Sequence, residues 1–155
     1  MTKNLAWRYF IVSLGLAYLL IIIKFIIFKH PIDLLNTQFF LSLQYGNYNY
    51  VPLKSIFGYV SGMPTWSIAV RNLFGNIVLF VPLGIFLPLI FQAISWRSVI
   101  CTALVVSVIF EVTQIFLVGT PDIDDVLLNT LGASVGYLVF KGVVVTIKRN
   151  KTKHS

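Results

Sequence analysis

Charged residues are scarce in this sequence. They make up 11% of its 155 residues, whereas 57% are hydrophobic, and only five residues are acidic. A soluble domain of this size could not bury so much apolar surface, because its interior is too small a share of the molecule. The shortage of charge therefore excludes an ordinary water-soluble domain. It indicates a lipid bilayer as the solvent, for a chain short enough to form one domain over residues 1–155.

Cysteine and histidine are also rare. The single cysteine, Cys101, lies within an apolar run, which excludes a disulfide framework and a paired-cysteine metal site. His30 and His154 lie in a loop and in the tail, so the sequence offers no nucleophilic triad. The aspartates of residues 122–125 lack the spacing and the glycine of an EF-hand loop. No metal and no cofactor are expected.

The net charge of +7 does not predict a nucleic-acid partner. The basic residues lie at the chain ends and between apolar runs, with no basic face and no nucleic-acid motif.

Long apolar runs are what the sequence has in abundance. Four of them, at about 9–28, 72–91, 98–118 and 125–147, approach or exceed the roughly 20 helical residues that cross a hydrocarbon core. They must be helical, because an open strand edge cannot be satisfied in lipid. No cleavage site follows the first run, which is therefore expected to stay as a helix. The prediction is an all-α membrane protein with about four transmembrane helices.

Lysine and arginine predict its orientation. The tail at 148–155 is basic and carries no acid, which places it in the cytoplasm. Four spans return the N-terminus to the same side. The long loop before the second span is then extracytoplasmic, and residues 53–66 within it predict a short helix at the interface, where Tyr and Trp are favoured.

Polar residues recur at helical spacing in three of the four spans. Asn72 and Asn76 are four apart, and Glu111 and Gln114 are three apart, so each pair shares one helix face. A third stripe starts at Asp122 and continues into small residues that allow close helix contact. Ionisable residues within a span usually face the bundle interior and indicate function. The candidate ligand-binding residues are Arg71, Asn72, Asn76, Glu111, Gln114, Asp122, Asp124, Asp125 and Asn129.

The helical rise predicts that these stripes meet at one depth. Glu111 lies about 10 Å below the outer surface, and Asn76 and Asn129 lie roughly 6–8 Å below it. Three helices thus deliver polar groups to one layer of the outer leaflet.

Each polar residue also has a structural interpretation. Thr120 and Pro121 form a good helix start, and capping accounts for one or two of the three aspartates. The amides can be interhelical hydrogen-bond partners. Arg71 is either an interfacial anchor or the ion partner of Glu111 or Asp125. Glu111 is the hardest to explain in this way, because a buried carboxylate needs a partner or a proton.

The combined motifs resemble those of VanZ-like membrane proteins. Residues 72–84 match N-x-x-x-N-x-x-x-F-x-P-x-G, residues 111–114 match E-x-x-Q, and residues 122–136 match D-I-D-D-x-x-x-N-x-x-G-x-x-x-G. Residues 49–52 are similar to a short N-x-x-P element, so the resemblance covers about 49–140. Members often have a basic residue shortly before D-I-D-D, where this chain has Gly119 and Thr120. If that group positions a ligand in the family, Arg71 serves instead or the ligand differs.

The resemblance implies a multi-pass protein of the bacterial cytoplasmic membrane. Its namesake members lower susceptibility to teicoplanin and other lipoglycopeptides. The leading hypothesis is a non-enzymatic, outer-leaflet site for an amphiphilic or lipid-linked ligand. The alternative is an intramembrane enzyme that acts on a lipid-linked glycan, with Glu111 and Asp125 as the catalytic carboxylates. A transporter ranks last, because the inner halves of the second and fourth spans are almost wholly apolar.

Overall fold

The computed structural model describes residues 2–27, 48–91, 93–117 and 121–153. Within them the chain forms five helices: α1 (Thr2–Ile27), α3 (Lys54–Val60), α4 (Trp66–Ile90), α5 (Trp96–Leu117) and α6 (Ile123–Lys153). All but α3 are long and apolar enough to cross a membrane. The predicted all-α fold with four apolar spans is thereby confirmed. The four long helices contain more residues than the predicted apolar runs, because the helical backbone continues into the polar residues that flank each run.

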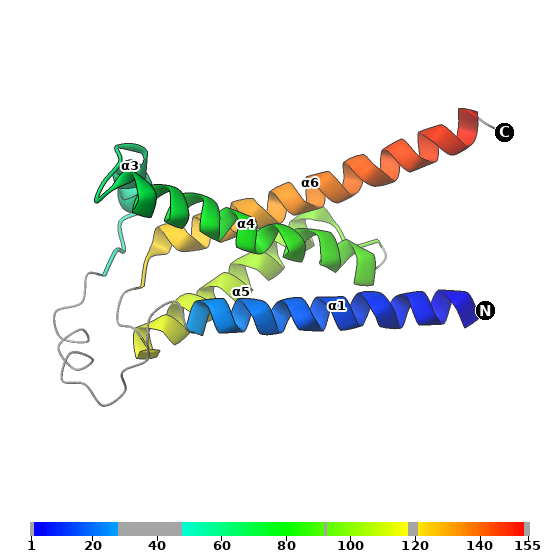
Figure 1. The fold of residues 1–155 in the computed structure, drawn as a ribbon, viewed down its shortest axis with the longest axis horizontal. Helices are drawn as coiled ribbons and strands as arrows, with labels where there is room; N and C mark the ends of the chain where they lie inside the picture. Colours follow the sequence, from blue (N-terminus) through cyan, green and yellow to red (C-terminus); the bar gives the residue numbers. More distant parts are fainter. Residues whose placement is uncertain (1, 28–47, 92, 118–120, 154–155) are drawn as a thin grey trace.

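The four long helices form a bundle with distinct ends. Both termini lie at one end, and α3 lies at the other, beside the starts of α4 and α6 (Figure 1). α6 packs most extensively on α4 and next on α5, whereas α1 contacts α4 and α5 at fewer positions. The end that carries α3 is where the predicted polar residues lie, and it is called the polar end below.

α4 and α6 pack backbone against backbone at three glycines. A Cβ atom on any of them would fall about 2 Å from a carbonyl oxygen of the other helix, far closer than a real Cβ approaches. The predicted close approach through small residues is therefore present. The pairs are Gly84 with Ala133 O at 1.9 Å, Gly132 with Ile77 O at 2.1 Å, and Gly136 with Val81 O at 2.0 Å.

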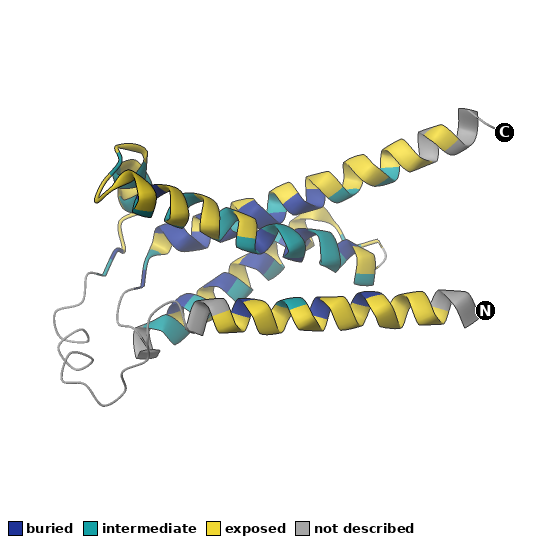
Figure 2. Cartoon of the chain, in the orientation of Figure 1, coloured by how far each residue is buried: buried dark blue, intermediate teal, exposed yellow. Residues whose placement is uncertain are grey.

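Buried side chains lie where α4, α5 and α6 face one another, and large apolar side chains cover the outward faces (Figure 2). Phe80 of α4 and Val99 of α5 are fully buried in this core, and Phe80 meets the ring of Phe110 edge-on. α1 joins the core through the fully buried Ile22. Apolar outward faces are what helices in lipid present, because lipid chains replace the missing protein contacts.

A tyrosine joins α1 to α4. The hydroxyl of Tyr18 donates to the carbonyl oxygen of Leu79 at 2.6 Å. The hydroxyl thus finds an acceptor inside the span, which a buried donor requires.

Some expectations fall outside what the structure describes. They include the loop at 28–47 and residues 118–120, where family members often have a basic residue. The side chains of the basic tail also fall outside it, at Lys148, Arg149, Lys151 and Lys153.

Candidate functional site

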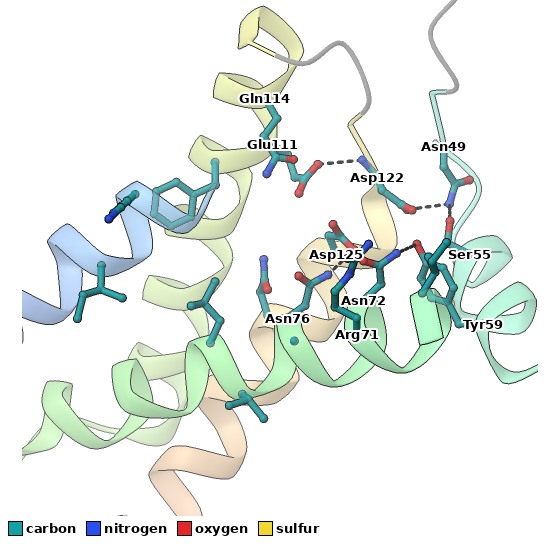
Figure 3. Close-up of a pocket in the computed structure, with 18 of the residues that line it drawn as sticks. Asn49, Ser55, Tyr59, Arg71, Asn72, Asn76, Glu111, Gln114, Asp122 and Asp125 are labelled. Atoms are coloured by element: carbon teal, nitrogen blue, oxygen red, sulfur yellow. Dashed lines mark hydrogen bonds between the residues drawn. The ribbon is translucent and has the colours of Figure 1, made fainter. Parts of the chain in front are cut away.

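A cavity of about 1260 Å³ opens at the polar end among α1, α3, α4, α5 and the start of α6 (Figure 3). This exceeds the roughly 300–1,000 Å³ of ordinary small-molecule sites. Of the nine candidate residues, eight line it and Asp124 does not. The predicted convergence of three stripes is thus seen in the geometry. The lining candidates are Arg71, Asn72, Asn76, Glu111, Gln114, Asp122, Asp125 and Asn129.

Asp124 holds α3 in place. Its side chain is fully buried and its carboxylate accepts the backbone N–H groups of Leu53, Ser55 (2.7 Å) and Ile56 (3.1 Å). These are donors at the N-terminus of α3, which a helix cannot satisfy by itself. Leu53 takes a left-handed φ of 69° at this cap. The geometry therefore gives Asp124 a capping role between two segments.

Asp122 caps α6. Its Oδ1 accepts the N–H of Asp124 at 2.9 Å, so the helix begins at Ile123 and not at the Thr120–Pro121 start that the sequence favours. Thr120 itself lies outside the described residues. The N–H of Asp122 in turn donates to Oε2 of Glu111 at 2.8 Å, which ties the end of α5 to the start of α6.

Asn49 closes this end of the cavity. Its backbone pairs with the segment before α6 in a parallel bridge to Asp122, with bonds of 3.1 Å from its N–H to Pro121 O and 3.0 Å from Ile123 N–H to its own O. Its amide nitrogen donates to Asp122 at 2.8 Å and to Ser55 at 2.9 Å (Figure 3). In the sequence, only the short N-x-x-P motif at 49–52 points to Asn49.

Two amides of α4 bind partners on other helices. Asn76 donates to a carboxylate oxygen of Asp125, and Asn72 donates to the hydroxyl of Tyr59 at 3.1 Å. Burial raises the pKa of Tyr59, the bond from Asn72 lowers it in part, and the nearby aspartates raise it further. The phenol of Tyr59 is therefore protonated at neutral pH and can donate a hydrogen bond.

The deepest polar pair joins α5 to α6. Asn129 donates from Nδ2 to Oγ of Ser107 at 2.8 Å, and both side chains are buried. Sequence reasoning missed Ser107, although it precedes Glu111 by four residues and so shares its helix face. Tyr59 was missed as well, because a lone tyrosine in an interfacial segment carries no distinctive signal.

The charged groups of the cavity differ in burial. Glu111 and Asp125 are each 8% exposed, whereas Lys24, Lys54 and Arg71 are exposed. Arg71 lies beside Asn72 in Figure 3. The carboxylates therefore belong to the interior of the site, and the basic groups belong to its rim.

The cavity is polar at one end and apolar at the other. Below the polar layer its wall is made by apolar side chains of α4 together with residues of α1 and α5. The wall of the cavity is therefore amphipathic. The residues of the lower wall are Tyr18, Ile21, Val78, Leu79, Pro82 and Phe110.

The family model for VanZ/LLP1 matches residues 15–146. The chain belongs to the VanZ/LLP1 family. The match takes in part of α1, which the motifs of residues 49–140 leave out. Protein VanZ of Enterococcus faecium is 35% identical over 71 residues, a stretch that covers 45% of this chain and 44% of that protein. No solved structure shows a significant match. The residues that line the cavity, from Tyr18 to Asn129, all lie within the stretch that the VanZ/LLP1 model matches.

Proposed function

We propose that this VanZ/LLP1-family membrane protein binds an amphiphilic or lipid-linked ligand in its cavity without chemically changing it. The observation that carries the proposal is the division of one cavity into a polar end and an apolar end within the four spans. A headgroup would contact the amides and carboxylates, and a chain would lie along the apolar wall of α1, α4 and α5. In this proposal, residues 1–155 form a single domain.

The orientation belongs to the same proposal. The basic tail and the N-terminal lysine and arginine support a cytoplasmic location for both termini. Because both termini lie at the end opposite α3, the cavity then opens into the outer leaflet (Figure 1). A cell-wall lipid intermediate or a lipoglycopeptide would reach it there.

Lowered susceptibility to teicoplanin is the biological effect that we propose. Expression of the protein in a susceptible bacterium should raise the inhibitory concentration of teicoplanin several-fold, because a bound lipoglycopeptide is withheld from its target. Asn76→Leu should remove the effect, since Asn76 lines the cavity and bonds Asp125. Inhibitory concentrations and membrane-protein amounts are measured side by side.

Thr102→Val is the matched control for Asn76→Leu. The Thr102 hydroxyl donates only to its own helix, at Ser98 O, and lies away from the cavity. It should keep the full effect. If expression of the wild-type protein leaves the inhibitory concentration of teicoplanin unchanged, the resistance proposal is wrong.

The enzyme alternative has one observation in its favour. Glu111 and Asp125 come from different helices, are almost fully buried, and line the same cavity, as a pair of acid–base carboxylates would. Glu111→Gln and Asp125→Asn each keep an acceptor oxygen for the Asp122 N–H and the Asn76 amide. If the protein only binds, both variants should retain most of the teicoplanin effect.

Loss of the effect in either amide variant would favour catalysis. A general acid or base accelerates a reaction about 100-fold or more, so its removal should abolish a teicoplanin effect that depends on catalysis. The amount of folded protein is compared in parallel, by size-exclusion chromatography of the purified variants. A normal elution profile and retained ligand binding, together with no biological effect, would support the enzyme.

A further inference from the structure

The carbonyl oxygen of Asn129 is the most informative atom of the cavity. Asn129 is 5% exposed, lines the cavity, and uses Nδ2 to bind Ser107. Among the described residues its Oδ1 is a buried polar atom with no hydrogen-bond partner. Nearly all buried polar groups in folded proteins are paired, so an orphan of this kind needs an explanation. A ligand that donates a hydrogen bond to it supplies one.

Two other cavity amides, on α4, also direct their nitrogen to a protein partner. Asn72 directs its nitrogen to Tyr59, and Asn76 directs its nitrogen to Asp125. The nitrogen and the oxygen of an amide occupy opposite branches of one planar group, so the carbonyl oxygen of each points away from that partner. The buried carboxylates of Glu111 and Asp125 add further acceptor oxygens to the same wall.

In the part of the chain that the structure describes, the interior of the polar end is therefore rich in acceptors, and the cationic side chains that line the cavity lie at its rim. Lys54 and Arg71 are exposed residues of the rim. A phosphate placed at the depth of Asn129 would bring mainly acceptor oxygens to Oδ1, which is itself an acceptor. Hydroxyl groups would instead donate to those oxygens.

We propose that the cavity selects an amphiphile whose headgroup presents hydroxyl donors directly beside its apolar tail, as a sugar joined to a diacylglycerol does. The inference rests on the proposed function and narrows its ligand class. Oδ1 of Asn129 is fully buried in the structure, so on this proposal the side chain moves slightly to present Oδ1 to the hydroxyl nearest the tail. Asn129 lies seven residues beyond Asp122 along α6, which is about 10 Å deeper, where the polar layer meets the apolar wall.

Two lipids with the same acyl chains test this. The full chain is placed in phosphatidylcholine nanodiscs that contain equal small mole fractions of monoglucosyl diacylglycerol and phosphatidic acid. The lipids that remain with the protein after mild detergent extraction are quantified by mass spectrometry. We expect the glucolipid to be enriched over phosphatidic acid by about tenfold, the effect of one or two good hydrogen bonds.

The outcomes separate the two proposals. Equal or greater enrichment of phosphatidic acid would overturn the donor-headgroup inference and leave amphiphile binding standing. Enrichment of neither lipid over phosphatidylcholine would overturn this inference and count against the binding function as well.

Variants at Asn129 test the named atom. Asn129→Leu has nearly the same shape and no acceptor, and should lower glucolipid enrichment about tenfold while phosphatidic acid is unchanged. Asn129→Asp keeps an acceptor oxygen and should restore the preference. Thr102→Val, whose hydroxyl bonds only within its own helix and lies away from the cavity, serves as the control and should keep full glucolipid enrichment. Full glucolipid enrichment in a folded Asn129→Leu protein would overturn the inference, and if that variant does not fold, the wild-type lipid comparison decides.

Discussion

Replacing Gly136 with alanine should destabilise the protein by about 3 kcal/mol, the upper end of the range for overpacked positions. The added methyl would fall 2.0 Å from the carbonyl oxygen of Val81, and a backbone atom cannot rotate aside as a side chain does. α4 and α6 would have to separate, and their contact is the most extensive in the bundle. Thermal unfolding of the purified protein in detergent measures the change.

Two glycines outside the contact provide matched controls. Gly75 and Gly142 have no atom within 4 Å of an added Cβ. Gly75→Ala and Gly142→Ala should leave stability unchanged or slightly higher, because alanine is the better helix former. A Gly136→Ala protein as stable as these two would show that α4 and α6 do not meet in this way.

Replacing Asp124 with alanine should release α3 from the bundle. The change removes the acceptor of three backbone N–H groups, at Leu53, Ser55 and Ile56, in a fully buried position. Hydrogen bonds to a charged group contribute about 1.5–3 kcal/mol each, so we expect a loss of at least about 3 kcal/mol for this segment. Amide hydrogen exchange reports it directly, because these three amides should become the most accelerated of the helix.

Ser61→Ala is the control for this effect. The Ser61 hydroxyl bonds the carbonyl of Phe57 within the exposed end of the same helix. Its removal should leave the exchange of the three capped amides unchanged. Slow exchange at these amides in Asp124→Ala would contradict the capping role and return Asp124 to the ligand-binding candidates.

Local patterns predicted much of the fold and of the cavity. The four spans follow from apolar runs, because only a helix satisfies its backbone in lipid. Helical spacing predicts which polar residues share a face, and the fixed rise per residue predicts their depth below the membrane surface. Together these two predictions bring Asn76, Glu111 and Asp125 to one cavity. Gly132 and Gly136 were recognised as a close-contact stripe for the same reason.

What the sequence did not reveal depends on contacts between distant segments. Asp124 accepts hydrogen bonds from residues about seventy positions earlier, and no local pattern distinguishes it from Asp122 or Asp125. Ser107 is a neutral residue in an apolar run, and its four-residue spacing to Glu111 does not by itself predict a bond to Asn129. α6 begins later than expected because Asp122 takes the capping position.

Tyr18, Leu79 and Phe110 form an apolar wall along which the tail of the proposed ligand would lie. The affinity for such a ligand is therefore measured against other lipids and not against free ligand in water. A lipid whose chain remains among lipid chains meets the protein in two dimensions, and its activity is its mole fraction in that leaflet. Partition into the bilayer has already concentrated such a molecule, so a modest preference over neighbouring lipids is enough to fill the cavity. Occupancy would then follow the lipid composition of the membrane and stay insensitive to dilution of the surrounding water.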